Sequence, residues 1–296
     1  MKSNDIDRKR VWSVKDVLQW TANYFREYGI QSPQLNAEMI IGNILGCRRI
    51  DLYLNYDKPL SNDERGKIRT LVKKRTQHFP MQYLLGQTEF YGYKFLIEED
   101  VFIPRPETET LVDAIVTYIK ESGKDFWEIL DIGTGTGIIP ITLYLHFQNS
   151  PVSISCLAVD CSDPSLHNAR KNIEYHHLNG IVLRKSNLFE NVEGRFDLIV
   201  SNPPYIPTDE ISSLEKEVRD YEPRTALDGG KDGLEYYNQI LKDAKPYLNP
   251  DGKIFFEISP TLSEKLEELG NQYGFKIIDK RKDYNHLYRV IAFSIK

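Results

Sequence analysis

The chain has 296 residues, of which 41% are hydrophobic and 27% charged, which is ordinary for a soluble globular protein of one or two domains. Its formal net charge of -5 gives no global attraction to phosphate backbones, which argues against a protein that binds by wrapping DNA. No apolar run approaches the roughly 18 residues of a membrane span, and the first residues lack a targeting signal, so we expect a cytoplasmic protein.

The first 80 or so residues predict a small helical domain. A Ser-Val-Lys-Asp sequence at residues 13–16 resembles a capping box and precedes apolar residues at helical spacing. Ser32 and Pro33 are a suitable N-cap and first helical residue, and Gly46 is a suitable end for that helix. Residues 61–64 form a full capping box. This region carries no catalytic signature of its own.

Residues 81–106 have a different character. An aromatic stretch, Phe-Tyr-Gly-Tyr-Lys-Phe, occupies residues 90–95 and places Gly92 between two short extended runs. This pattern predicts a hairpin, which we expect to link the helical domain to the rest of the chain.

From residue 107 onward, predicted helices and strands alternate. A helix is expected over residues 108–120 and another from Ile138. The expected strands are 127–132, 152–160, 181–185, 196–201, 253–258, 275–279 and 287–293. Repeated units of this kind predict an α/β fold with a doubly wound, mostly parallel seven-stranded sheet covered by helices on both faces.

A glycine-rich turn follows the first of these strands. Gly133, Thr134, Gly135, Thr136 and Gly137 give the spacing Gly-x-Gly-x-Gly, which lets the backbone turn sharply and leaves room for a ligand. The turn departs from the dinucleotide fingerprint and lacks the Lys-Ser/Thr ending of a phosphate-binding loop, so it favours a cofactor without phosphates. A tight turn with no ligand is the alternative.

Asp160 ends the next predicted strand. A carboxylate at this place can accept hydrogen bonds from both hydroxyls of a ribose. S-adenosylmethionine has a ribose and no phosphate, so it is the expected cofactor. An exposed Asp at a strand end is the alternative. Cys47, Cys156 and Cys161 form no Cys-x-x-Cys pair and no histidine cluster accompanies them, so we expect reduced thiols and no metal site.

The sharpest motif is Asn202-Pro203-Pro204-Tyr205, directly after the predicted strand 196–201. Ligands of open α/β sheets bind at the carboxyl ends of strands, so these residues should face the same pocket as the glycine turn. If a planar NH2 group donates to Asn202 Oδ1 and the Pro203 carbonyl, its nitrogen is held for methyl transfer, while Tyr205 packs on the flat group. A rigid proline turn is the alternative.

Together these residues closely resemble the HemK-like release factor glutamine methyltransferases. Three further segments carry the likeness: Pro-Met-Gln-Tyr-Leu-Leu-Gly at 80–86, Phe-Ile-Pro-Arg-Pro-Glu-Thr-Glu at 102–109 and Tyr-Glu-Pro-Arg-Thr-Ala-Leu at 221–227. The resemblance implies a helical domain, residues 1–80, that docks a peptide chain release factor. It also implies a methyltransferase domain, residues 107–296, that modifies the side-chain amide nitrogen of the glutamine in the factor's Gly-Gly-Gln loop.

Site residues follow from the resemblance. It implies that residues 133–137 and Asp160 hold the methionine and ribose parts of the cofactor, and that residues 202–205 hold the glutamine. Asn202 would also lie against the cofactor. Arg105 and Glu107 lie in a segment that should line the cofactor's entrance, where they either act directly or form an ion pair that anchors a loop.

The chain departs from the family pattern at two places. Asn187 and Leu188 stand where the family usually has Asp and often Trp for the adenine. Asn187 can still accept from the adenine amino group, but Leu188 offers no aromatic face. Ser259 and Leu262 replace a common Gly and Gln, where we expect an effect on packing rather than chemistry.

Other functions remain open from the sequence. An adenine-N6 DNA methyltransferase could use the same motif, but it needs a basic recognition region that this acidic chain lacks. A methyltransferase for a ribosomal protein glutamine is a second alternative, and a cofactor-binding sensor is a third. We expect a monomer whose partner is a release factor and that binds neither nucleic acid directly nor membranes.

Overall fold

The computed structural model describes residues 11–296 and divides into two units between Gly86 and Gln87. The N-terminal unit is helical. Its helices are α1 (Val14–Glu27), α2 (Pro33–Leu45), α3 (Arg49–Leu54), α4 (Asn62–Arg75) and α5 (Met81–Leu85). Their apolar faces pack into one core, which includes Phe25, Ile40 and Ile68.

The helix ends of this unit test the capping predictions. At α1, Ser13 Oγ accepts from the Asp16 amide while the Asp16 carboxylate accepts from the Ser13 amide, as predicted. The box at Ser61 is equally complete. Pro33 is the first residue of α2, Gly46 is its C-cap and Ser32 is its N-cap, as predicted, although Ser32 caps the helix without its side chain. The Ser32 backbone is left-handed (φ 47°), and its carbonyl accepts from the side chain of Asn36.

A hairpin opens the C-terminal unit, formed by β1 (Gln87–Phe90) and β2 (Tyr93–Leu96) around a turn in which both central residues have positive φ. The hairpin was predicted, and the boundary between the two units falls inside the predicted linker, residues 81–106. Residues 81–85 form α5 in the N-terminal unit. The hairpin buries Phe90 and Phe95 in the core of the C-terminal unit, whose Asn172 side chain bonds both backbone groups of Leu96.

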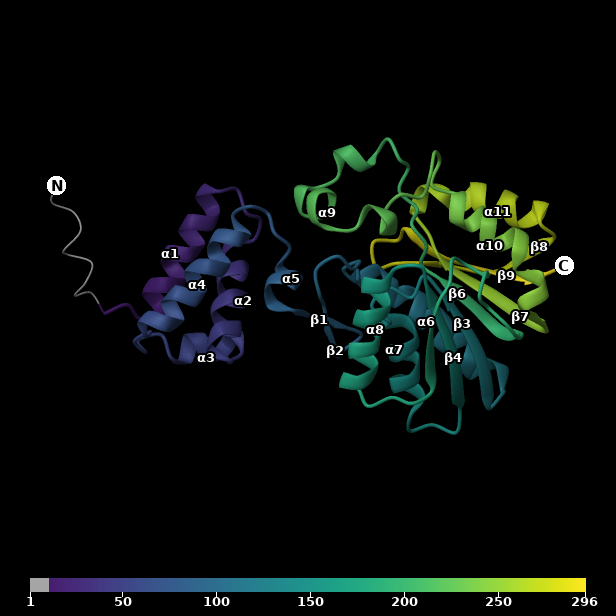
Figure 1. The fold of residues 1–296 in the computed structure, drawn as a ribbon, viewed down its shortest axis with the longest axis horizontal. Helices are drawn as coiled ribbons and strands as arrows, with labels where there is room; N and C mark the ends of the chain where they lie inside the picture. The colour runs from purple at the N-terminus through teal and green to yellow at the C-terminus, as the bar shows by residue number, and fades with distance from the viewer. Residues whose placement is uncertain (1–10) are drawn as a thin grey trace. The chain divides into compact units, whose positions relative to one another are not determined.

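The C-terminal unit contains the predicted sheet (Figure 1). Its strands are β3 (Phe126–Ile132), β4 (Ser153–Asp160), β5 (Ile181–Lys185), β6 (Phe196–Ser201), β7 (Leu248–Glu257), β8 (Phe275–Lys282) and β9 (Tyr288–Ile295). They lie in the order β5-β4-β3-β6-β7-β9-β8. The strands from β5 to β7 are parallel, and β9 is antiparallel to both β7 and β8. The chain winds outward from β3 to β5 and then returns to place β6 beside β3, which creates the switch point where such sheets bind ligands.

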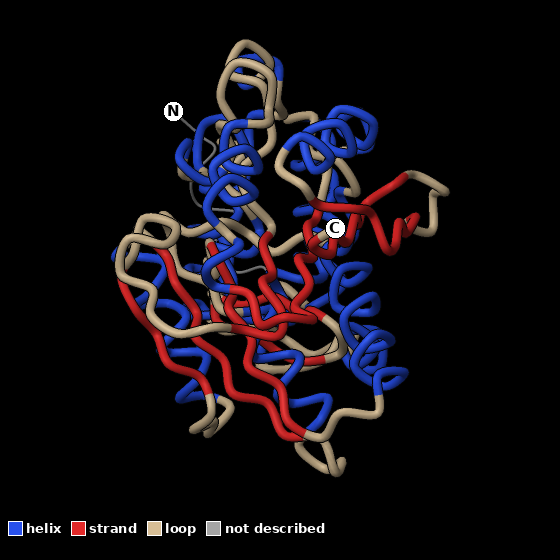
Figure 2. Tube along the Cα trace, turned by 90° about the vertical axis from the view of Figure 1, so that its right-hand side faces the viewer, coloured by secondary structure: helices blue, strands red, loops and turns tan. Residues whose placement is uncertain are grey.

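Helices cover both faces of this sheet (Figure 2). The helices on the two faces are α6 (Glu109–Ser122), α7 (Ile138–Phe147), α8 (Asp163–Tyr175), α10 (Glu235–Asp243) and α11 (Ser263–Gln272). A further helix, α9 (Lys216–Tyr221), lies in the segment between β6 and α10 and has no buried residue. Side chains alternate along each strand, so Ile129 joins the core beneath α6 and α7 while Leu130 joins the core beneath α10 and α11. The predicted fold class is confirmed. Within residues 11–296, no helix combines the length and the apolar character that crossing a membrane requires.

Candidate active site

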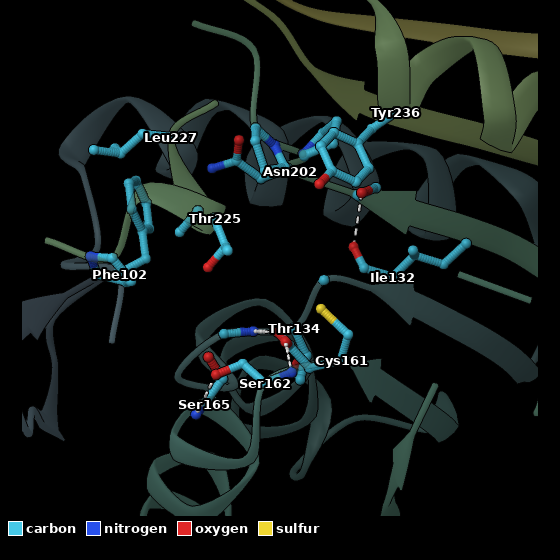
Figure 3. A pocket seen from close by; sticks show the side chains of 18 of the residues that line it. Phe102, Ile132, Thr134, Cys161, Ser162, Ser165, Asn202, Thr225, Leu227 and Tyr236 are labelled. Carbon is cyan, nitrogen blue, oxygen red and sulfur yellow. Dashed lines mark hydrogen bonds between the residues drawn. The ribbon is translucent and has the colours of Figure 1, made fainter. Parts of the chain in front are cut away.

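Side chains and turns at the carboxyl ends of β3, β4 and β6 line one cavity of about 310 Å³, formed wholly by residues of the C-terminal unit. The glycine turn follows β3, Asp160 ends β4, and the Asn-Pro-Pro-Tyr turn follows β6. Figure 3 shows Asn202 and Tyr236 on one side of the cavity and Thr134, Cys161 and Ser162 on the opposite side. The structure thus brings together the two motifs that the sequence singles out.

The glycine turn is built from backbone hydrogen bonds. The amides of Gly133 and Thr134 both donate to the Val159 carbonyl at 2.9 and 3.0 Å. Gly133 and Gly135 have positive φ, and a Cβ atom added to either would meet nothing within 4 Å, so both leave open space above the backbone. Both glycines line the cavity, with Thr134 and Thr136.

Gly137 has a different place from the other glycines of the turn. It precedes the first residue of α7 and does not line the cavity. An added Cβ would lie 3.1 Å from Ile141 and 3.3 Å from Ala169 of α8, so this glycine allows the two helices to approach each other. Its predicted contact with the cofactor stays a prediction, and its position favours a packing role.

The Asp160 carboxylate fixes the glycine turn from the neighbouring strand. Its Oδ2 accepts from the Gly135 amide at 2.8 Å, and its Oδ1 accepts from the Ser162 amide at 2.9 Å. Burial raises the pKa of Asp160, and the three backbone donors around it oppose that rise. Three backbone donors leave about one of the four lone-pair sites of the carboxylate, so it can still accept from a ligand at the cavity wall.

The Asn-Pro-Pro-Tyr turn presents acceptors. Asn202 Nδ2 donates to Thr108 Oγ1 at 3.2 Å, which leaves Oδ1 of the same amide as an acceptor. In residues 11–296 no group donates a hydrogen bond to Asn202 Oδ1 or to the Pro203 carbonyl. Pro203, Pro204 and Tyr205 also line the cavity. Both acceptors of the predicted pair are therefore available.

A third wall of the cavity comes from the segment between the Asn-Pro-Pro-Tyr turn and α10, to whose residues the sequence analysis gave no role in the site. Leu214, Val218, Pro223 and Leu227 line the cavity from this segment. An ion pair between Arg105 and the buried Glu222 ties the segment to the 102–105 strip, and Glu222 also accepts from the Ile103 amide.

This pairing bears on the two interpretations of Arg105 and Glu107. Arg105 lines the cavity, but its guanidinium pairs with Glu222 and donates to the Ile103 carbonyl. These contacts favour the interpretation of Arg105 as a loop anchor. Burial raises the pKa of Glu222, while the charge of Arg105 opposes that rise. Glu107 does not line the cavity.

Asn187 and Leu188 lie at the end of the cavity beyond β5. Asn187 Nδ2 donates to Glu190 at 3.0 Å, so its Oδ1 remains an acceptor, in keeping with the prediction for the adenine amino group. Leu188 has an unusual positive φ of 49°, and its carbonyl accepts from the Ser186 hydroxyl, which stabilises this conformation. Leu188 therefore offers an aliphatic surface at a fixed position.

Sequence reasoning missed the residues that hold the Asn-Pro-Pro-Tyr turn in place. Gly229 lies directly against it, because an added Cβ would fall 2.7 Å from the Tyr205 Cα and 2.8 Å from the Pro204 carbonyl oxygen. The Gly229 amide also donates to the Ile206 carbonyl at 2.8 Å. The sequence Asp-Gly-Gly at 228–230 was the available signal for a close backbone approach.

Two buried carboxylates lie beside the site without lining the cavity. Burial raises the pKa of Asp131, on β3, to about 7, and the charge of Asp160 adds to that rise. Burial likewise raises the pKa of Glu257, at the end of β7, to about 7. In the described part of the chain, neither carboxylate completes a hydrogen bond.

Comparisons with known proteins agree with this architecture. Residues 16–86 match the PrmC N-terminal domain, and residues 107–216 match the methyltransferase small domain. A release factor glutamine methyltransferase of Geobacter sulfurreducens is 37% identical over 290 residues, which cover 98% of this chain and 99% of that protein. Another, of Chlorobaculum tepidum, is 38% identical and covers 96% and 98%.

A solved methyltransferase from Pyrococcus furiosus is 22% identical with a TM-score of 0.50, covers 69% of this chain and 89% of that one, and supports the fold alone. The identities to the curated relatives extend over nearly the full length of both proteins. They confirm the resemblance that the motifs indicated. The chain belongs to the release factor glutamine methyltransferase family.

Proposed function

We propose that this protein transfers the methyl group of S-adenosylmethionine to the side-chain amide nitrogen of the glutamine in the Gly-Gly-Gln loop of a peptide chain release factor. The observation that carries the proposal is the position of two acceptors, Asn202 Oδ1 and the Pro203 carbonyl, on the same cavity as the glycine turn. Such a pair matches the two N–H bonds of one primary amide.

The chain's own residues fit the cofactor. Gly133 and Gly135 leave space that a side chain would fill, and Asp160 keeps acceptor capacity for ribose hydroxyls. Ile132, Ile138 and Leu188 supply apolar surface for the rest of the molecule. The cavity volume of about 310 Å³ lies within the range of ligand pockets. When bound, S-adenosylmethionine supplies a methyl group activated by a sulfonium centre.

The opposite wall supplies orientation. An amide nitrogen is a weak nucleophile because its lone pair is delocalised, so holding it in line contributes much of the rate. Donation of its two N–H bonds to Asn202 and Pro203 fixes the plane of the amide, and Tyr205 packs against that plane. Two consecutive prolines hold the carbonyl direction, since their φ angles are restrained. The nitrogen loses a proton readily once alkylated, so the reaction needs no strong base.

The helical unit is proposed to dock the release factor. On α1 and its C-cap, the exposed Trp20 stacks on the half-buried Tyr24 with ring centroids 5.0 Å apart, and Tyr24 contacts the exposed Tyr28 with ring centroids 4.7 Å apart. Arg65 and Arg69 line a hollow that also includes Trp20. Aromatic and arginine side chains are the residues enriched in protein interfaces. We further propose that the protein is a cytoplasmic monomer. Its net charge of -5 gives no general attraction to nucleic acid, so we propose that it binds none directly.

The test is mass spectrometry of a purified release factor after incubation with this protein and S-adenosylmethionine. We expect one added methyl group on the glutamine of the Gly-Gly-Gln loop, and none on a factor in which that glutamine is replaced by alanine. Duplex DNA and ribosomal protein are assayed in parallel. Methylation of either one, with an unmodified release factor, would contradict the proposal.

A further inference from the structure

The Asn202 side chain must present its oxygen, and not its NH2 group, to the substrate. An asparagine amide can turn by 180° at little cost, and the turned form would place a donor against the donor groups of the substrate amide. The geometry of the wall behind Asn202 therefore decides whether the site can work. The inference below rests on the proposed function.

Thr108 is the direct partner of the Asn202 NH2 group. It is fully buried, ends the short 3-10 helix Pro106–Thr108, and immediately precedes α6. Its Oγ1 lies 3.2 Å from Asn202 Nδ2. A hydroxyl can either donate or accept, so Thr108 by itself stabilises both orientations of the amide.

Glu257 removes that ambiguity. Its carboxylate is 1% exposed, completes no hydrogen bond within residues 11–296, and lies close enough to Thr108 and Asn202 for both to lower its pKa. An ionised carboxylate only accepts hydrogen bonds. It draws the Thr108 hydroxyl proton toward itself, and the lone pairs of Thr108 are then left to accept from Asn202 Nδ2.

We propose that Thr108 and Glu257 are positioning residues that hold the Asn202 amide with its oxygen toward the substrate. In the proposed arrangement Asn202 Nδ2 donates to Thr108 Oγ1, as in the structure, and the Thr108 hydroxyl points its proton toward the Glu257 carboxylate. Thr108 also lines the cavity, whereas Glu257 does not. Both act on turnover through Asn202.

The charge of Glu257 makes the arrangement sensitive to pH. Burial raises its pKa to about 7, the nearby Arg289 on β9 lowers it, and Glu107 raises it. The phenols of Tyr205 and Tyr237 also face this carboxylate and stay neutral, because burial raises the pKa of both. Below about pH 7 a protonated Glu257 donates to Thr108, which then donates to Asn202 and favours the turned amide. Turnover therefore falls as pH decreases through this value.

The test uses the full chain with a release factor as substrate and compares Thr108→Val, Thr108→Ser and Glu257→Gln. Thr108→Val removes the hydroxyl at similar volume, so kcat should fall by about 10- to 100-fold, since misplacing a reacting group has effects of this size. Thr108→Ser keeps the hydroxyl and should retain kcat within about threefold. Glu257→Gln should lower kcat and abolish the fall in turnover below pH 7. The dissociation constant of S-adenosylmethionine should be unchanged in all three variants, which also reports that they fold.

The outcomes separate the inference from the proposed function. If the wild-type protein methylates no release factor, the proposed function is wrong and the inference falls with it. If the wild-type protein is active while Thr108→Val and Glu257→Gln keep its kcat and its pH profile, only the positioning role is wrong. If Thr108→Val fails to bind the cofactor, the kcat of Thr108→Ser and the pH profile of Glu257→Gln test the positioning role in its place. A loss in Thr108→Ser equal to that in Thr108→Val would also overturn the role.

Discussion

The cavity wall that carries the glycine turn and the wall that carries the Asn-Pro-Pro-Tyr turn are held in place by different kinds of contact. The glycine turn bonds to the adjacent strand through its backbone, and two side chains support it. Asp160, 25 residues from Gly135, accepts from the Gly135 amide, and Asn172 Nδ2 donates to the Thr136 carbonyl at 3.0 Å. The Asn-Pro-Pro-Tyr turn is held by a side-chain bond between Asn202 and Thr108, which are 94 residues apart. The backbones of Gly229 and Gly233 also pack against this turn, so closely that a Cβ atom at either position would meet the backbone of Tyr205.

This difference indicates that one wall determines cofactor affinity and the other determines turnover. A turn made from backbone bonds can hold a ligand through shape, so changes there should alter cofactor affinity. The opposite wall depends on the direction of one side-chain amide, that of Asn202, and one backbone carbonyl, that of Pro203, so changes there should alter turnover. Variants on each wall can test whether affinity and turnover separate in this way.

Asn202→Ala should have the largest effect. It removes one of the two acceptors for the substrate amide, and loss of one preorganised polar group in an active site typically lowers kcat by about 10²–10³-fold. The dissociation constant of the cofactor should change little, because the glycine turn and Asp160 are untouched. Single-turnover kinetics and calorimetric titration measure the two quantities.

Asn238→Ala is the matched control for that variant. Asn238 lies on α10 outside the cavity, where its Oδ1 accepts from the Tyr273 hydroxyl at 2.8 Å. We expect wild-type turnover from this control. Near-normal turnover in Asn202→Ala would show that Asn202 is not needed for methyl transfer, and it would contradict the idea that this wall determines turnover.

Gly229→Ala should have the second-largest effect on turnover. Its kcat should be lower by about 10²-fold, since a shift of about 1 Å at a reacting group can have this effect. The added Cβ would lie 2.7 Å from the Tyr205 Cα, and neither backbone can yield without moving the turn. Gly66→Ala is the control, because its Cβ meets nothing within 4 Å and it lies in α4, where alanine is favoured. Equal activity in both variants would show that the turn tolerates displacement.

Gly229 also illustrates how far the sequence alone could lead. The sheet, the glycine turn and the Asn-Pro-Pro-Tyr turn were predictable because their signals are local: periodicity, turn residues and short spacings. The contact of Gly229 with Tyr205, the bond from Asn202 to Thr108 and the pairing of Arg105 with Glu222 were not, because they join segments distant in sequence. The hairpin was recognised by its aromatic pattern, yet its attachment to Asn172 had no local signal.

Asp160→Ala should have the smallest effect on turnover and the clearest effect on affinity. Hydrogen bonds to a charged group contribute about 1.5–3 kcal/mol, which corresponds to an increase of about 10- to 100-fold in the cofactor dissociation constant. At saturating cofactor, kcat should stay near the wild-type value, because the acceptors on the opposite wall do not depend on Asp160. Asp163→Ala removes a nearby exposed carboxylate that pairs with Lys185 and should leave affinity unchanged. If Asp160→Ala instead lowered kcat at saturation as much as Asn202→Ala does, affinity and orientation would be coupled through the switch point between β3 and β6, and the two walls would have to be treated as a single element.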